Sequence, residues 1–229
     1  MFCKKNFNAL IGIIAVLFLV STEGYIRPHV TRTGDLDSVL IFFITAYTLL
    51  FWDYLLNSEQ KNKNRLLGIG LLVFAAFMSK SVAGLMPILG LFLGAIFIKK
   101  GKFILTNIQT YFVAITTLLL CGTYYLIRYL AADDGYLEKV FFSEYMRFTH
   151  NIMTYHEQPF WFHLKNMYER FYQPFIFILP ITLIGLFAKN EKFRKTSILG
   201  ITFCVSYFFI NFLSERQIRM VRSTALSVF

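Results

Sequence analysis

Charged residues are scarce in this chain: Asp, Glu, Lys and Arg make up 16% of its 229 residues, whereas 56% are hydrophobic. A water-soluble domain of this length could not bury so much apolar surface. The composition therefore excludes an ordinary soluble protein and predicts a polytopic membrane protein.

Cysteine is equally sparse. Cys3, Cys121 and Cys204 contain no CxxC pair and lie near a terminus or inside apolar runs. This pattern is typical of small buried apolar residues and speaks against a disulfide framework or a cysteine-based metal site. A small-residue cleavage site is also missing before Glu23, so the apolar run at 7–22 is predicted to be a retained span.

Apolar runs that are long enough, or nearly long enough, to cross a membrane recur along the chain. There are seven, at 7–22, 39–56, 66–78, 82–98, 103–130, 174–188 and 197–213. The third has only 13 residues, against roughly 20 for a standard span. Ser79, Lys80 and Ser81, followed by Gly84 and Pro87, predict a turn and a helix restart between the third and fourth runs.

The distribution of charge supports seven spans. With that count, 12 of the 23 basic residues but only 3 of the 13 acidic residues lie on the side of the N-terminus. Short loops rich in Lys and Arg stay in the cytoplasm, so the N-terminus is predicted to be cytoplasmic. The net charge of +10 then reflects topology, and no nucleic-acid partner is predicted. We expect an all-α helix bundle forming one membrane domain over 1–229, with extracytoplasmic loops at 23–38 and 131–173.

The loop at 23–38 concentrates ionisable residues between two apolar runs, where such groups are costly and are usually functional. Asp35 and Asp37 stand just before the second run. One interpretation is that an aspartate caps this helix, and the other is that it acts as an acid/base or orienting carboxylate. Arg27 and Arg32 are candidate donors to phosphate oxygens, or contacts to lipid headgroups.

Lys80 lies at the outer end of two runs, on the same predicted face as this loop. A lysine in such a place commonly extends to the membrane interface. The alternative is a point charge that binds a phosphate group.

The long loop carries FFSEYMRFTHNIMTYHEQPFWFHLKNMYERF at 141–171. Its apolar residues recur at helical spacing and predict two amphipathic helices that lie on the membrane. His156 and Glu157 fall between them, with Glu144 upstream. Histidine and glutamate can bind zinc, but the spacing is not that of a recognised site. A histidine that faces solvent or lipid headgroups is the other interpretation.

Four segments together resemble the C-type polytopic glycosyltransferases, in the branch of the lipid A aminoarabinose transferase and the bacterial relatives of protein O-mannosyltransferases. HVTRTGDLDS at 29–38 is similar to the branch's H-x-x-R-T-G-D-x-D, and FMSKSVAGLMP at 77–87 is similar to its T-K-G…P stretch. DDGYL at 133–137 resembles D-P-G-Y-L, and HEQPFWFH at 156–163 resembles H-x-x-P-F-W-Y-Y. The resemblance covers 7–180.

This resemblance implies an enzyme of the bacterial inner membrane that transfers a sugar from a polyprenyl-phosphate donor to a lipid or protein acceptor outside the cytoplasm. It uses an inverting displacement, in which a carboxylate assists the acceptor and basic residues hold the departing phosphate. Asp37 matches the second aspartate of the family's loop. The implied site comprises catalytic Asp37 and Asp35, substrate-binding His29, Arg32, Lys80, Glu144 and Arg147, and His156 for a divalent metal ion.

The chain also departs from the family. Relatives begin with a further span and an outer loop whose Asp-Glu motif carries the principal catalytic aspartate. Where relatives read Glu-His before Arg-Phe, this chain has Glu144-Tyr145, and no lysine-tyrosine-proline stretch follows Leu213. We therefore expect a fragment of a transferase. The alternative is a non-catalytic membrane protein, either a lipid-binding remnant or a transporter-like subunit, although the spans hold few of the midplane ionisable residues that transporters use.

Overall fold

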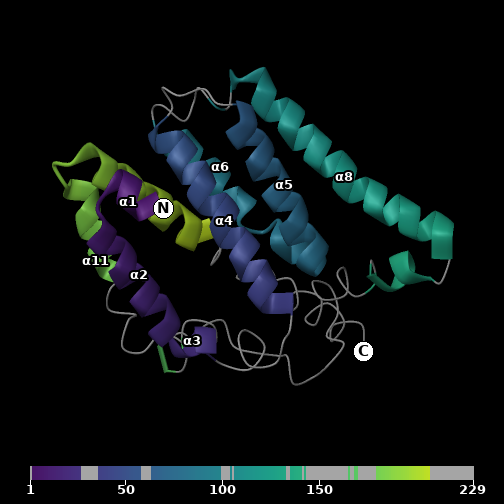
Figure 1. Cartoon of the computed structure of the whole chain (residues 1–229), viewed down its shortest axis with the longest axis horizontal. Coiled ribbons are helices and arrows are strands. Elements are labelled where there is room, and N and C mark those ends of the chain that lie inside the picture. Colours follow the sequence, from purple (N-terminus) through teal and green to yellow (C-terminus); the bar gives the residue numbers. More distant parts are fainter. Residues whose placement is uncertain are drawn as a thin grey trace, which may run out of the picture.

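The computed structural model describes residues 2–26, 36–57, 63–98, 104, 106–132, 135–140, 142, 165, 168–169 and 179–206. Every regular element in these ranges is a helix (Figure 1). Three of the helices, α4, α5 and α8, are long and apolar enough to cross a membrane. The predicted class, a helical membrane protein, is thereby confirmed, while the number of spans stays a prediction.

The three long helices form the main part of the bundle. α4 (Leu36–Leu56) packs against α5 (Lys63–Lys80), and α8 (Ile108–Ala132) covers the other side of α5 (Figure 1). Apolar side chains close the interface between α4 and α5. They form one cluster around Tyr47, Val73 and Ala76 and a second around Tyr54, Leu55 and Leu66.

α6 (Ile88–Phe97) and the helical residues 191–206 form a second tightly packed pair. Gly94 of α6 faces Leu199 and Thr202, and Gly90 faces Phe203 and Ser206. Because these glycines carry no side chain, the two helices approach closely. α11 (Leu179–Ile184) and the short η6 (Gly185–Phe187) precede this second helix and lie in the sixth predicted run.

The N-terminal part consists of α1 (Phe2–Asn6), α2 (Ala9–Ser21) and α3 (Glu23–Ile26). The Asn8 side chain accepts a hydrogen bond of 2.8 Å from the backbone N–H of Ile11 and so starts α2. α2 buries none of its residues against the described part of the chain. Its 13 residues extend for about 20 Å, which is shorter than the hydrocarbon core of about 30 Å. The predicted first span is therefore a shorter helix than the apolar run suggested.

The turn predicted between the third and fourth runs is present. α5 ends at Lys80, a 3₁₀ helix η1 covers Ser81–Gly84, and α6 begins directly after Pro87. Proline suits this position because it has no N–H to leave unpaired. The third run also proves long enough, since α5 continues beyond the apolar residues at both ends and reaches 18 residues.

The ion pairs show which helix ends lie together, and the grouping is that of a chain whose successive helices run in opposite directions. Lys5 and Arg65 reach Asp53 at one end of the bundle, whereas Lys80 reaches Asp37 at the other. We call these the Asp53 end and the Asp37 end. α5 and α8 run parallel, because Gly70 faces Val113 and Thr117, while Phe77, nearer the Asp37 end, faces Tyr124 and Tyr125.

Candidate functional site

Two of the predicted site residues meet at the Asp37 end. Asp37 lies in the first turn of α4, and Lys80 is the last residue of α5. Because these helices run in opposite directions, the two residues lie side by side, and Lys80 Nζ forms an ion pair with Asp37 Oδ1. Each charge also suits its own helix terminus. The Lys80 side chain stays 48% exposed and that of Asp37 24%, so both can contact a further group.

The chain bends sharply where Lys80 stands. Lys80 has backbone angles φ −153° and ψ 42°, and Ser81 has φ +50°, in the left-handed region that non-glycine residues rarely adopt. Ser81 Oγ and Tyr125 OH share a hydrogen bond of 2.6 Å. Three residues further on, the buried Tyr47 OH donates to the carbonyl oxygen of Gly84 over 3.0 Å.

Aromatic side chains surround this bend. The Phe77 ring stands perpendicular to that of Tyr125, with ring centroids 5.5 Å apart, and Tyr124 packs against both. The Arg128 guanidinium lies 4.5 Å from the ring centroid of Tyr136. The pKa of the Tyr136 phenol is raised, first by a hydrogen bond to Tyr124 and second by burial, so the phenol stays neutral at pH 7. Tyrosine and arginine at a helix end are typical of the membrane–water interface.

Sequence reasoning missed this aromatic group. The run YYLIRY at 124–129 ends the fifth apolar run on the face predicted to hold Asp37 and Lys80. That combination of residue type and predicted face is the signal that would have found it.

The other predicted site residues lie outside the described residues, so the structure does not test them. They are Asp35, His29, Arg32, Glu144, Arg147 and the metal candidate His156. Most of the loop at 131–173, with its predicted amphipathic helices, also lies outside, although residues 136–140 are helical. Among the residues that are described, no group of three His, Cys, Asp or Glu side chains is placed to hold a metal ion.

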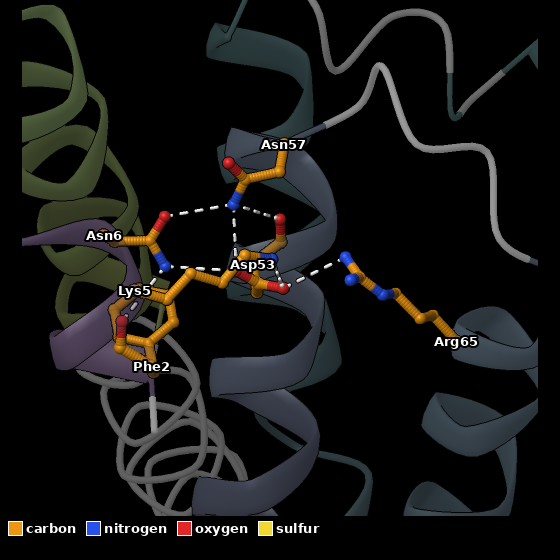
Figure 2. Close-up of polar contacts among 6 residues, drawn as sticks. All are labelled: Phe2, Lys5, Asn6, Asp53, Asn57 and Arg65. Atoms are coloured by element: carbon orange, nitrogen blue, oxygen red, sulfur yellow. Dashed lines mark hydrogen bonds and ion pairs between the residues drawn. The ribbon is translucent and has the colours of Figure 1, made fainter.

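A second polar group, at the Asp53 end, was not predicted (Figure 2). Asp53 Oδ2 contacts Lys5 Nζ at 2.7 Å and Arg65 NH1 at 3.1 Å. Asp53 Oδ1 accepts hydrogen bonds from the amide groups of Asn6, at 3.1 Å, and Asn57, at 2.9 Å. The Asn57 amide also donates to Asn6 Oδ1 at 3.0 Å, so the network joins α1 to α4 and α5.

The Asp53 network is structural in character. Its carboxylate accepts from four donors, and its side chain is only 13% exposed, which leaves little of it open to a substrate. Burial of a carboxylate is tolerable when both oxygens are paired in this way. The sequence does hold a signal for this network. Asp53 lies near the end of an apolar run, Asn57 follows four residues later, and basic residues are predicted on the same side of the membrane.

Comparison of the chain with protein-family models, with curated proteins and with solved structures finds no match.

Proposed function

We propose that the chain is a polytopic membrane glycosyltransferase, or part of one, that binds a polyprenyl-phosphate sugar at the Asp37 end. The observation that supports this is the ion pair between Asp37 and Lys80, which joins a carboxylate and an ammonium from residues 43 apart in the sequence. Both were selected from the motifs that resemble the family. The interface residues Tyr124, Tyr125 and Arg128 lie at the same end.

In the proposed reaction, Lys80 and Asp37 have different roles. The acceptor hydroxyl attacks the anomeric carbon while the bond from that carbon to the phosphate oxygen breaks. Lys80 stabilises the negative charge that develops on the departing lipid phosphate. Asp37 orients the acceptor hydroxyl and accepts its proton. The predicted metal at His156 lies outside the described residues, and no step is assigned to it.

The proposed orientation follows the charge distribution. The Asp53 end, with its basic flanking residues, faces the cytoplasm of a bacterial cell, and the Asp37 end faces outward. Seven spans belong to this proposal, as does a lipid or protein acceptor.

The ion pair also favours a second candidate, a lipid-binding protein without transfer activity. The Asp37 carboxylate is already engaged by Lys80, whereas the half-exposed ammonium still binds phosphate. The two candidates share phosphate binding and differ in the role of Asp37.

Binding tests the shared step. The full chain in lipid nanodiscs is titrated with farnesyl phosphate and, separately, with farnesol, by isothermal calorimetry. We expect the phosphate to bind at least about tenfold more tightly. Lys80→Ala removes most of this preference, whereas Lys139→Ala, which removes an exposed lysine of the short helix after α8, leaves it unchanged. Equal affinity for both compounds, or an unaffected Lys80→Ala variant, contradicts the proposal.

Transfer tests the second step. With polyprenyl-phosphate sugar labelled in the sugar, we expect the label to reach a membrane acceptor with the native chain and to stay on the donor with Asp37→Asn. Asp37→Asn retains phosphate binding, because it removes the anion that competes for Lys80. Binding without transfer in the native chain selects the lipid-binding candidate.

A further inference from the structure

The ammonium of Lys80 contacts Asp37 from a residue that stands in a bend of the chain. A straight continuation of α5 would give Lys80 helical backbone angles, but it has φ −153° and ψ 42°. Ser81 then takes φ +50°. For a residue with a side chain, this conformation is strained, and it persists only where the surroundings hold it.

Contacts from two neighbouring helices hold the bend. From α8, the Tyr125 hydroxyl pairs with Ser81 Oγ at 2.6 Å, and Phe77 and Tyr124 fix the Tyr125 ring. From α4, the Tyr47 hydroxyl binds the carbonyl of Gly84, at the far end of η1. Within the described part of the chain, these hydroxyl groups reach Ser81 Oγ and the Gly84 carbonyl, so the tyrosines contact the bend on the far side of Lys80.

We propose that Tyr125 and Ser81 are positioning residues, whose shared hydrogen bond keeps the bend in the conformation that directs Lys80 toward Asp37. A role of this hydrogen bond in catalysis rests on the proposed function. Its role in placing Lys80 is independent of that function, because it concerns only how α8 holds the end of α5. Tyr47 secures the other end of η1 and keeps the bend next to α4.

A thiol cross-linking experiment measures the position of the bend directly. Asp37→Cys and Lys80→Cys are combined in the full chain after the native cysteines Cys3, Cys121 and Cys204 are replaced by alanine. The rate of disulfide formation in isolated membranes then reports how often the two positions meet. The double cysteine variant lacks the ion pair, so the rate of disulfide formation depends on the backbone and on the side chains that hold the bend.

Four further substitutions separate the hydrogen bond from other effects. We expect Tyr125→Phe and Ser81→Gly to slow cross-linking about fivefold, the equivalent of one net hydrogen bond. Tyr129→Phe, the same change at an exposed tyrosine of α8, leaves the rate unchanged. Ser81→Asn restores a nearly native rate, because asparagine tolerates the left-handed region and its amide oxygen accepts from Tyr125.

A second cysteine pair, Asn6→Cys with Asn57→Cys at the Asp53 end, controls for global unfolding. We expect Tyr125→Phe to leave its rate unchanged. An unchanged rate at the Asp37 end with Tyr125→Phe and Ser81→Gly overturns the proposal. Equal slowing at both ends also overturns it, because Tyr125 would then act on overall stability. No sugar is used, so failure here leaves the proposed function standing, and absence of phosphate binding leaves the positioning role standing.

Discussion

The two aspartates of α4 show how environment separates residues of one type. Asp53 is nearly enclosed and accepts from four donors, which lie on α1, on α5 and directly after α4. Asp37 is more exposed, and its ion-pair partner among the described residues is Lys80. A saturated carboxylate holds helices together. A carboxylate with one half-exposed partner can exchange that partner for a ligand. The residue type alone does not distinguish these roles.

Replacing Asp53 by asparagine is expected to destabilise the fold. Asp53→Asn removes the counter-charge of Lys5 and Arg65 and weakens the hydrogen bonds at a site that is only 13% exposed, at a cost of about 1–3 kcal/mol. For a chain of this size, each kcal/mol lowers Tm by about 2–4 °C. Thermal unfolding in detergent, followed by tryptophan fluorescence, measures the change.

Glu169→Gln is the matched control for this variant. It breaks an ion pair with Lys165, 3.8 Å long, in which both side chains are exposed, Lys165 at 67% and Glu169 at 49%. Such pairs contribute about 0–1 kcal/mol, so Tm should hardly move. Equal Tm values for the two variants would contradict the structural role of Asp53.

At the scale of elements, the chain packs against its own backbone where it turns from α5 to α6. Gly84 lies against the backbone of Ala76, so an added Cβ would stand 2.5 Å from the Ala76 carbonyl group. Backbone atoms cannot rotate away as a side chain can. The turn therefore depends on glycine at this position for a steric reason.

Gly84→Ala is expected to lower stability by about 1–3 kcal/mol, the usual cost of overpacking. Gly122→Ala makes the same change within α8, where no described atom lies within 4 Å of the new Cβ. It should be neutral or slightly stabilising, because alanine favours helix over glycine. Both are compared by Tm in detergent, and a Gly84→Ala variant as stable as Gly122→Ala would refute the steric argument.

This turn also shows what sequence reasoning can and cannot reach. Serine, glycine and proline at 79–87 predicted the break correctly, because turn signals are local. The residues that hold the break were not predictable, since Tyr47 is 37 residues from Gly84 and Tyr125 is 44 residues from Ser81. The meeting of Asp37 with Lys80 was anticipated only as a shared membrane face. The Asp53 network was missed because each of its members, taken alone, reads as an ordinary flanking residue.

At the scale of the whole molecule, the two polar groups of the described residues lie at opposite ends of α4 and α5, with apolar clusters between them. Ile98, at the end of α6, and Ile104, just before α8, belong to the same cluster as Tyr54 and Leu66 near the Asp53 end. α6 therefore ends, and α8 begins, near the Asp53 end. α8 in turn carries the chain back to the Asp37 end.

Reporter fusions test this arrangement in cells. Alkaline phosphatase, which is active only outside the cytoplasm, is expected to be inactive when fused after Lys102 and active when fused after Gly135. The fusion points are joined by α8, so they must lie on opposite sides if α8 crosses the membrane. Equal activity at both sites would contradict a spanning α8, and the reverse result would invert the proposed orientation.

The Asp53 network also sets an order of events during synthesis. Lys5 leaves the ribosome 48 residues before Asp53, and Arg65 follows 12 residues after that. At about 5–20 residues per second, the roughly 60 residues from Lys5 to Arg65 take about 3–12 s to synthesise. Lys5 and Asn6 cannot form the network before Asp53, Asn57 and Arg65 have been synthesised. Insertion of α4 and α5 must therefore come first. Lys5 and Asn6 thus reach their final contacts only after α4 and the start of α5 have been made.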